Sequence, residues 1–262
     1  MSYIEGFYNN YNEQGRLTSK HGQVEFITTM HYLQKYLNPG AKVIEIGAGT
    51  GRYSRAIADM GYEVCAVELV QHNIDIFKSN ISSSQKINIT QGNALDLSAF
   101  ADDSFDITLS LGPMYHLYTE TDKKQAISEA LRVTKPGGIV LCAYCISDAT
   151  LITQCFMCPD GNFLRDFINR GKINPKTFDT TSVPEDIFEL VRKEDIDKLM
   201  AGFDVERLHY IATDLFTLYM REAVAKMADE LFEIYLRYHL SVCERKDLVG
   251  LTHHSLDMFR KK

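Results

Sequence analysis

The stretch VIEIGAGTG, residues 43–51, decides the fold of this chain. Its apolar residues Val43, Ile44 and Ile46 form a short run that is typical of a buried parallel strand. The glycines that follow allow the backbone to turn sharply and a ligand to approach it closely. We therefore predict a strand, a glycine-rich turn and then a helix over residues 50–60.

The next predicted strand, residues 64–68 (VCAVE), ends on an acid. Glu68 lies seventeen residues after Gly51, and a carboxylate there can accept hydrogen bonds from both ribose hydroxyls of an adenosine-type ligand. A dinucleotide fingerprint would place its third glycine at position 52, which is Arg52 here. This disfavours an NAD-dependent enzyme, which stays open as a rival together with a merely structural βαβ unit. A P-loop is excluded because no Gly-Lys-Ser or Gly-Lys-Thr follows the turn.

The G-x-G-x-G turn resembles the first motif of class I S-adenosylmethionine-dependent methyltransferases, in which Glu45 or an Asp in its place ends the first strand. Residues 92–96 (GNALD) follow a predicted strand at 87–91 and resemble the adenine-binding segment of that family. Most members carry Asp where this chain has Asn93, whose carbonyl can still accept a hydrogen bond from the exocyclic amine.

Two later segments support the same resemblance, in the expected order. Residues 104–111 (SFDITLSL) resemble the fourth-strand motif and lead into GPMYHL at 112–117. Residues 130–138 (ALRVTKPGG) resemble the turn from a helix into the fifth strand, which we predict at 139–146. The strict match covers residues 40–147.

The resemblance implies an α/β fold: a Rossmann-like, seven-stranded, mostly parallel sheet with helices on both faces and a helical cap built from insertions. It implies S-adenosyl-L-methionine as cofactor and S-adenosyl-L-homocysteine as product. The implied cofactor-binding residues are Tyr11, Arg16, Glu45, Gly47, Ala48, Gly49, Gly51, Tyr53, Glu68, Leu69, Asn93, Ala94, Leu95, Ser110 and Leu111.

The segment before the sheet is dense in aromatic and polar residues, and in many family members it folds over the cofactor as a lid. From such a lid Tyr11 and Arg16 can reach the methionine carboxylate, since arginine binds a carboxylate bidentately. An equally weighted alternative is that the aromatic residues simply pack the first helix onto the sheet.

His116 and Tyr115 follow the fourth strand, near the place where the family holds the methyl group. His116 is a candidate base or acceptor-orienting group near neutral pH, and Tyr115 can form a hydrogen bond or offer its ring to the sulfonium. Alternatively, Tyr115 points into the cap and His116 caps a helix. The GPMYHL segment resembles a subgroup of bacterial-type methyltransferases whose acceptors are largely unassigned, so the resemblance supplies a reaction class and no substrate.

A single methyltransferase domain is expected over residues 1–262, with an N-terminal helical lid, a cofactor-binding core, two cap insertions and the remaining sheet elements. These parts are expected at 1–39, at 40–147, at 148–190 and 214–250, and at 191–213 and 251–262, respectively. Helices are predicted at 26–37, 163–168, 194–201 and 219–243, and further strands at 205–213 and 255–260. A cap rich in Phe, Tyr, Met and Leu suits a small, partly apolar acceptor, although most of its apolar stripe fits the cap's own core.

The chain of 262 residues carries a net charge of −7 with dispersed basic residues, which disfavours tRNA or DNA as substrate. No run approaches the ~18 apolar residues of a membrane span, so we expect a cytoplasmic protein. We predict a small-molecule methyltransferase that acts on O, N or S, with no nucleic-acid or membrane partner, as a monomer or homodimer. A methyltransferase for tRNA or protein, and a cofactor-binding regulator without catalysis, are the alternatives.

Two cysteine pairs, Cys142 with Cys145 and Cys155 with Cys158, raise the question of a zinc site. Only nine residues separate the pairs, which is fewer than the usual spacing. Cys142 and Cys145 also lie three apart on a predicted strand, where they point to opposite faces. We therefore predict no metal site and expect buried thiols, with Cys158 beside a turn and accessible.

Overall fold

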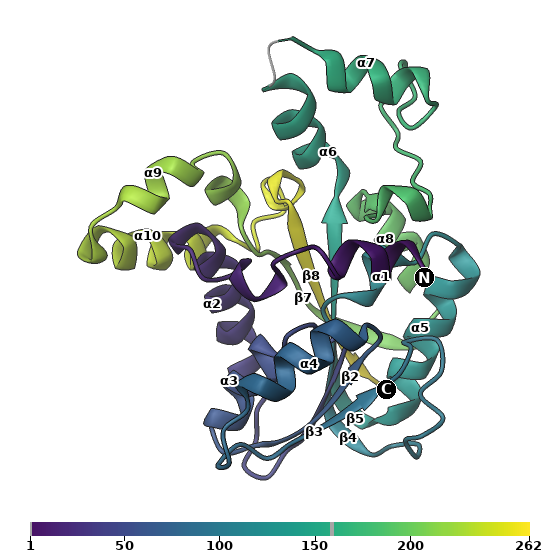
Figure 1. Ribbon diagram of the computed structural model, residues 1–262, viewed down its shortest axis with the longest axis vertical. Helices are drawn as coiled ribbons and strands as arrows, with labels where there is room; N and C mark the ends of the chain where they lie inside the picture. Colours follow the sequence, from purple (N-terminus) through teal and green to yellow (C-terminus); the bar gives the residue numbers. More distant parts are fainter. Residues whose placement is uncertain (1, 158–159) are drawn as a thin grey trace.

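The computed structural model describes residues 2–157 and 160–262, and its centre is an eight-stranded sheet (Figure 1). Seven strands lie side by side in the order β3-β2-β1-β4-β5-β8-β7, and the eighth, β6, pairs with β5. The strands are β1 (Lys42–Ile46), β2 (Glu63–Glu68), β3 (Ile87–Gln91), β4 (Phe105–Ser110), β5 (Thr134–Ile146), β6 (Leu190–Val191), β7 (Val205–Ala212) and β8 (His254–Lys261).

The sheet is mostly parallel, as the sequence predicts. β1 to β5 and the short β6 run parallel to their partners, whereas β8 runs antiparallel to both β5 and β7. The Rossmann-like fold class is therefore confirmed. β6 has no counterpart among the predicted strands, because a strand of two residues has no periodic signal.

Helices cover both faces of the sheet, and each face has its own apolar core. On one face β1, β2 and β4 contribute Val43, Val64 and Leu109, and the helices α2 (Lys20–Gln34), α3 (Arg52–Asp59) and α4 (Gln71–Asn80) pack there. On the other face Ile44 and Ile46 pack against α5 (Glu120–Val133) and α8 (Lys193–Met200). This alternation along β1 is what a strand buried on both faces requires.

The remaining elements gather at the carboxyl ends of the parallel strands. In Figure 1 α9 and α10 extend on one side of that end and α6 and α7 on another, with α1 across the opening and the C-terminus at the opposite end of the sheet. The N-terminal segment, called the lid below after its expected role, contains α1 (Tyr3–Tyr8) and η1 (Glu13–Gly15). The others are η2 (Pro113–His116), α6 (Ser147–Thr150), η3 (Leu151–Phe156), α7 (Asn162–Asn169), η4 (Pro184–Asp186), η5 (Leu215–Leu218), α9 (Arg221–Lys226), α10 (Asp229–Val242) and η6 (Val249–Leu251).

Two predicted helices differ most from the structure in their bounds. α2 begins at Lys20 instead of residue 26, because the Ser19 side chain accepts from Gly22 N–H and caps the helix. The helix predicted at 219–243 is divided into α9 and α10, since Met227 is extended with ψ of 138°. Lys20 Nζ donates to Met227 O at 2.6 Å and so satisfies a carbonyl at the break.

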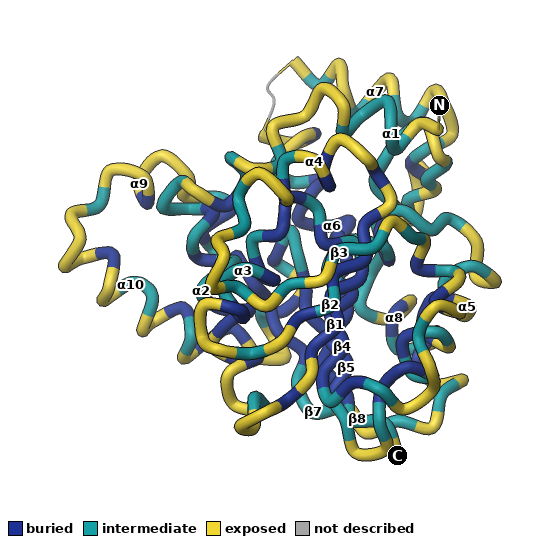
Figure 2. The backbone as a smooth tube through the Cα atoms, turned by 60° about the horizontal axis from the view of Figure 1, so that its bottom comes forward, coloured by how far each residue is buried: buried dark blue, intermediate teal, exposed yellow. Residues whose placement is uncertain are grey.

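Burial is concentrated in the sheet. Figure 2 shows the central strands as buried, while most of α9 and α10 is exposed or intermediate. No helix in the described part of the chain is long and apolar enough to cross a membrane. Cys142 and Cys145 are buried on β5, and Cys158 lies outside the described residues.

Candidate active site

The glycine-rich turn between β1 and α3 lines a cavity at the carboxyl edge of the sheet, called the first cavity below. Gly47, Gly49 and Gly51 have φ of 71°, 56° and 81°, in the left-handed region that favours glycine. A Cβ on Gly51 would lie 2.0 Å from the Phe77 ring, so this glycine permits α4 to pack closely. Gly47 and Gly49 line the cavity, whereas Gly51 does not.

Glu68, at the end of β2, lies beside the turn and is buried. Its Oε2 accepts from Gly49 N–H at 2.8 Å, and its Oε1 accepts from Val70 N–H at 2.9 Å and from Asn73 Nδ2 at 3.2 Å. The buried Oδ1 atom of Asn73 has no hydrogen-bond partner among the described residues, and Asn73 lines the cavity. An unpaired buried acceptor next to a carboxylate fits a ligand that brings hydroxyl donors.

The segment after β3 lines the same cavity with Asn93, Ala94 and Leu95. Asn93 Oδ1 accepts from Leu95 N–H at 3.0 Å, so one of its two lone pairs is already used within the turn. The second lone pair and the amide N–H groups remain available for an adenine edge.

Glu45 on β1 fixes the start of α3. Its Oε2 accepts from the backbone N–H of Ser54 at 2.9 Å and from the Ser54 hydroxyl. Burial, together with the charge of Glu68, raises the pKa of Glu45 to about 8, although the hydrogen bonds from Ser54 oppose the shift. Glu45 therefore holds the turn and the helix in place at the base of the cavity.

Arg16 lies in the lid and is held by two carboxylates. Its Nε donates to Glu13 Oε1 at 3.1 Å, and its Nη1 donates to Glu25 Oε1 and Oε2 at 2.9 and 3.0 Å. Arg16 lines the first cavity, as the prediction for a carboxylate-binding residue requires. Tyr11 does not line it: its ring stacks on Phe7 at 5.0 Å between centroids and borders a neighbouring cavity instead.

His116 is fixed at both ring nitrogens. Its Nδ1 lies 2.7 Å from the carbonyl oxygen of Ile187 and therefore donates, so in the neutral ring its Nε2 accepts from Tyr8 Oη at 3.0 Å. Burial lowers the pKa of His116 to about 4, although the bond to Ile187 opposes this. The ring is therefore neutral at physiological pH, which does not fit the expected base near neutrality.

The carbonyl of Ile187 also accepts from Tyr118 Oη at 2.6 Å. Ile187 has φ of 66°, a strained conformation for a β-branched residue that only surrounding contacts can maintain. Next to it, Phe188 packs on His116 and on Phe7 of the lid, with centroids 5.4 and 5.5 Å apart. The lid, the segment after β4 and the loop before β6 thus meet around His116.

Tyr115 is buried, and its hydroxyl donates to Leu111 O at 2.8 Å. The hydroxyl is therefore engaged within the turn, and the ring is the part that faces its neighbours. Tyr115 and His116 both line the first cavity.

The structure brings most of the predicted residues together around the first cavity. Among them are Arg16, Glu45, Gly47, Ala48, Gly49, Tyr53, Glu68, Leu69, Asn93, Ala94, Leu95, Leu111, Tyr115 and His116. Tyr11, Gly51 and Ser110 do not line it; Ser110 is buried on β4 between Ile46 and Cys142.

Sequence reasoning missed several lining residues, of which Tyr8, Glu13 and Asn73 matter most. Asn73 carries a detectable signal, because it falls in the first turn of the helix that follows Glu68. Tyr8 carries none that separates it from the neighbouring aromatic residues.

Known proteins resemble the chain in this same core. Residues 44–142 match the family model of a methyltransferase domain. Over 117 residues the chain is 31% identical to a demethylmenaquinone methyltransferase of Clavibacter sepedonicus, an alignment that covers 44% of this chain and 46% of that relative. The chain thus matches less than half the length of this relative.

Solved structures extend the likeness to the whole fold. The PH0226 protein of Pyrococcus horikoshii superposes with a TM-score of 0.61 at 17% identity, covering 98% of this chain and 99% of that one. A SAM-dependent methyltransferase of Methanosarcina mazei gives 0.57 at 17% identity, with coverage of 88% and 96%. The chain therefore shares the fold of these solved structures, and its sequence resembles a methyltransferase domain over residues 44–142.

Proposed function

We propose that the protein is an enzyme that transfers the methyl group of S-adenosyl-L-methionine to an O, N or S nucleophile of a small molecule by in-line displacement. The observation that carries this proposal is the first cavity, in which the glycine-rich turn, Glu68 and the unpaired oxygen of Asn73 face one space.

The chemical groups of these residues match those of the cofactor. Glu68 and Asn73 offer acceptors for ribose hydroxyls, and the backbone of Gly47 and Gly49 permits close approach. Asn93 and its neighbours offer an edge for adenine, while Arg16 offers a guanidinium for the methionine carboxylate. When bound, the cofactor supplies a methyl group on a sulfonium, which a nucleophile can attack without metal or redox chemistry.

His116 acts as an orienting group in this proposal. Because its Nδ1 is tied to Ile187 and its Nε2 to Tyr8, it fixes the position of the Tyr8 hydroxyl at the cavity. Tyr115 contributes its ring to the wall. Holding a nucleophile in line and excluding water is the main task of such a site, and a general base is needed only where the acceptor must lose a proton.

A small acceptor is favoured over a macromolecule by two features. The lid helix α1 contacts η4, and its residues Ile4 and Tyr8 line the first cavity, so the lid forms part of the wall of this cavity. The net charge of −7 opposes the approach of a polyanion such as tRNA. The demethylmenaquinone methyltransferase of Clavibacter sepedonicus aligns with only 44% of this chain, so demethylmenaquinone is one small acceptor among those to be tested.

Titration calorimetry with S-adenosyl-L-methionine, S-adenosyl-L-homocysteine and NAD tests the cofactor. Binding of both adenosyl ligands, lost in Gly49→Arg, is expected; absence of heat with either, or tighter binding of NAD, would contradict the proposal. A screen of small O, N and S nucleophiles for formation of S-adenosyl-L-homocysteine then separates an enzyme from a regulator that binds the cofactor without turning it over. Transfer to bulk tRNA or DNA, lost in Gly49→Arg, would contradict the small-molecule assignment.

A further inference from the structure

A second cavity, of about 220 Å³, lies directly beside the first. Its wall comes from three distant parts of the chain: the lid and α2, the segment from Asp214 to Arg221, and the start of β8. Arg16 and Leu17 line both cavities. The rings of Tyr115 in the first and His254 in the second are 6.2 Å apart between centroids.

The two carboxylates in the second cavity are already bound by protein groups. Glu25 accepts two hydrogen bonds from Arg16 and lies 3.3 Å from His254 Nδ1. Asp214 Oδ1 accepts from Thr252 Oγ1 at 2.5 Å and from His253 N–H at 2.8 Å. Both carboxylates therefore serve to hold protein groups.

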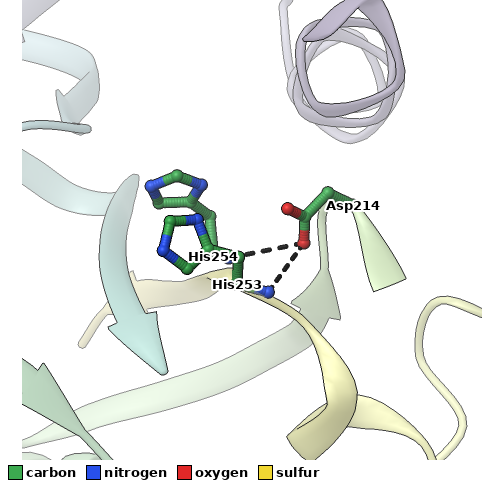
Figure 3. A group of neighbouring side chains, drawn as sticks. All are labelled: Asp214, His253 and His254. Atoms are coloured by element: carbon green, nitrogen blue, oxygen red, sulfur yellow. Dashed lines mark hydrogen bonds between the residues drawn. The ribbon is translucent and has the colours of Figure 1, made fainter. Parts of the chain in front are cut away.

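Within the described residues 2–157 and 160–262, Asp214, His253 and His254 lie close together and are of the residue types that bind metal ions. Figure 3 shows that the Asp214 carboxylate faces the backbone N–H groups of both histidines, while the two imidazole rings lie next to each other away from these bonds. Asp214 thus positions the histidine pair. Although burial opposes it, Glu25 raises the pKa of His254 well above its ordinary value, which favours the protonated ring and so disfavours His254 as a metal ligand.

The cationic and neutral donors of the second cavity, in contrast, lack strong partners. Arg221 forms no hydrogen bond or ion pair with any residue that the structure describes, and the His253 ring forms no hydrogen bond with them. Among the described residues, the His21 ring forms hydrogen bonds only with the Ser19 hydroxyl, which lies 3.1 Å from Nδ1 and 3.3 Å from Nε2. A guanidinium and two imidazoles that converge on one cavity are donors for the oxygens of an anion.

We propose that this second cavity binds the methyl acceptor and that the acceptor is a small molecule with an anionic group, a carboxylate or a phosphate, held by Arg221 with His21 and His253. The inference rests on the proposed function, because it takes the first cavity as the cofactor site. Arg16 and Leu17, which line both cavities, then mark the junction across which the acceptor's nucleophile reaches the methyl group while its anionic group stays in the second cavity.

Binding of small probes to the apoprotein and to its complex with S-adenosyl-L-homocysteine tests this assignment. The probes are benzoate, phenyl phosphate and the neutral benzamide, together with the same three groups on a propyl skeleton. Affinity is measured by calorimetry, and the site is located from the ring signals of His21 and His253 in NMR spectra. Arg221→Gln removes the charge, and Lys226→Gln on the same short helix is the matched control, since Lys226 does not line the cavity.

The expected result is that at least one anionic probe binds at millimolar concentration or below, about tenfold tighter than its amide. Arg221→Gln should weaken it about tenfold, as loss of a hydrogen bond to a charged group does, while Lys226→Gln should leave it unchanged. Whether the anionic group of the acceptor is a carboxylate or a phosphate is decided by which of the two kinds of probe binds more tightly.

Equal binding of amide and anion, equal effects of the two variants, or no anionic probe binding at all would overturn the inference. Zn²⁺ or Mn²⁺ that shifts the His253 signals without any anion would replace it with a metal site. These outcomes are separate from the cofactor assignment. If S-adenosyl-L-homocysteine binds normally, the proposed function stands while this inference fails; if it does not bind, the proposed function fails whatever the probes do.

Discussion

Replacing Gly51 by alanine should destabilise the fold far more than the same change at Gly40. Both glycines are left-handed, with φ of 81° and 78°, but a Cβ at Gly40 has nothing within 4 Å, whereas one at Gly51 lies 2.0, 2.2 and 2.3 Å from three atoms of the Phe77 ring. Phe77 is fully buried, so its ring cannot move into solvent.

The magnitude follows from these two terms. A left-handed alanine costs roughly 1–2 kcal/mol, partly offset by a lower entropy of the unfolded chain. Gly40→Ala should therefore lower the free energy of unfolding by about 1 kcal/mol. Gly51→Ala adds overpacking of roughly 1–3 kcal/mol, for a total of about 2–4 kcal/mol.

Urea unfolding followed by circular dichroism measures both values. The double variant Gly51→Ala with Phe77→Leu removes the ring atoms that the new Cβ meets, so its loss of stability should be smaller than the sum of the single losses by at least about 1 kcal/mol. Equal losses at Gly51 and Gly40, or strict additivity with Phe77→Leu, would refute the explanation that Gly51 serves the packing of α4.

Three further outcomes are expected. Glu68→Ala should cost about 2–3 kcal/mol of cofactor affinity in calorimetry, as loss of a charged acceptor does, while the exposed Glu63→Ala on the same strand should cost nothing. The unfolded chain releases the Glu45 proton near pH 4.5, whereas the folded protein keeps it up to about pH 8. Between these pH values Glu45 therefore lowers the free energy of unfolding as pH rises, by at most about 1.4 kcal/mol per pH unit. Urea titrations from pH 5 to 8 should therefore show Glu45→Gln gaining stability relative to wild type. Finally, Tyr8→Phe and His116→Asn should each lower turnover about tenfold, and the double variant should be no slower than either single variant. Because His116 is neutral, the wild-type pH–rate profile should show no limb from this residue between about pH 6 and 7. A limb in that range that disappears in His116→Asn would instead show that His116 acts as a base.

The sequence predicts the core well because its signals are local. The run at residues 43–46, the glycines after it and Glu68 lie within one βαβ unit, where spacing translates directly into geometry. β3 at Ile87–Gln91 agrees with the prediction residue for residue for the same reason. The break at Met227 is not local, because it depends on Lys20, which lies more than two hundred residues away along the chain.

The residues around His116 show where sequence reasoning ends. Its two partners, Tyr8 and Ile187, lie 108 and 71 residues away and come from segments without hydrophobic periodicity. The sequence identifies His116 as a candidate, but its neutral state follows from burial, which only the assembled fold reveals. Whether Tyr8 or Tyr11 lines the first cavity likewise depends on the direction of α1, a helix of six residues.

Every residue that lines the second cavity lies outside residues 44–142, the part that matches the methyltransferase domain. Under the proposed function, the part of the chain that resembles known methyltransferases in sequence holds most of the methyl-donor site, whereas the recipient is held entirely by residues outside it. Exchanging the segment 213–253 for the corresponding segment of a related methyltransferase should therefore change which molecule receives the methyl group, while binding of S-adenosyl-L-homocysteine is retained.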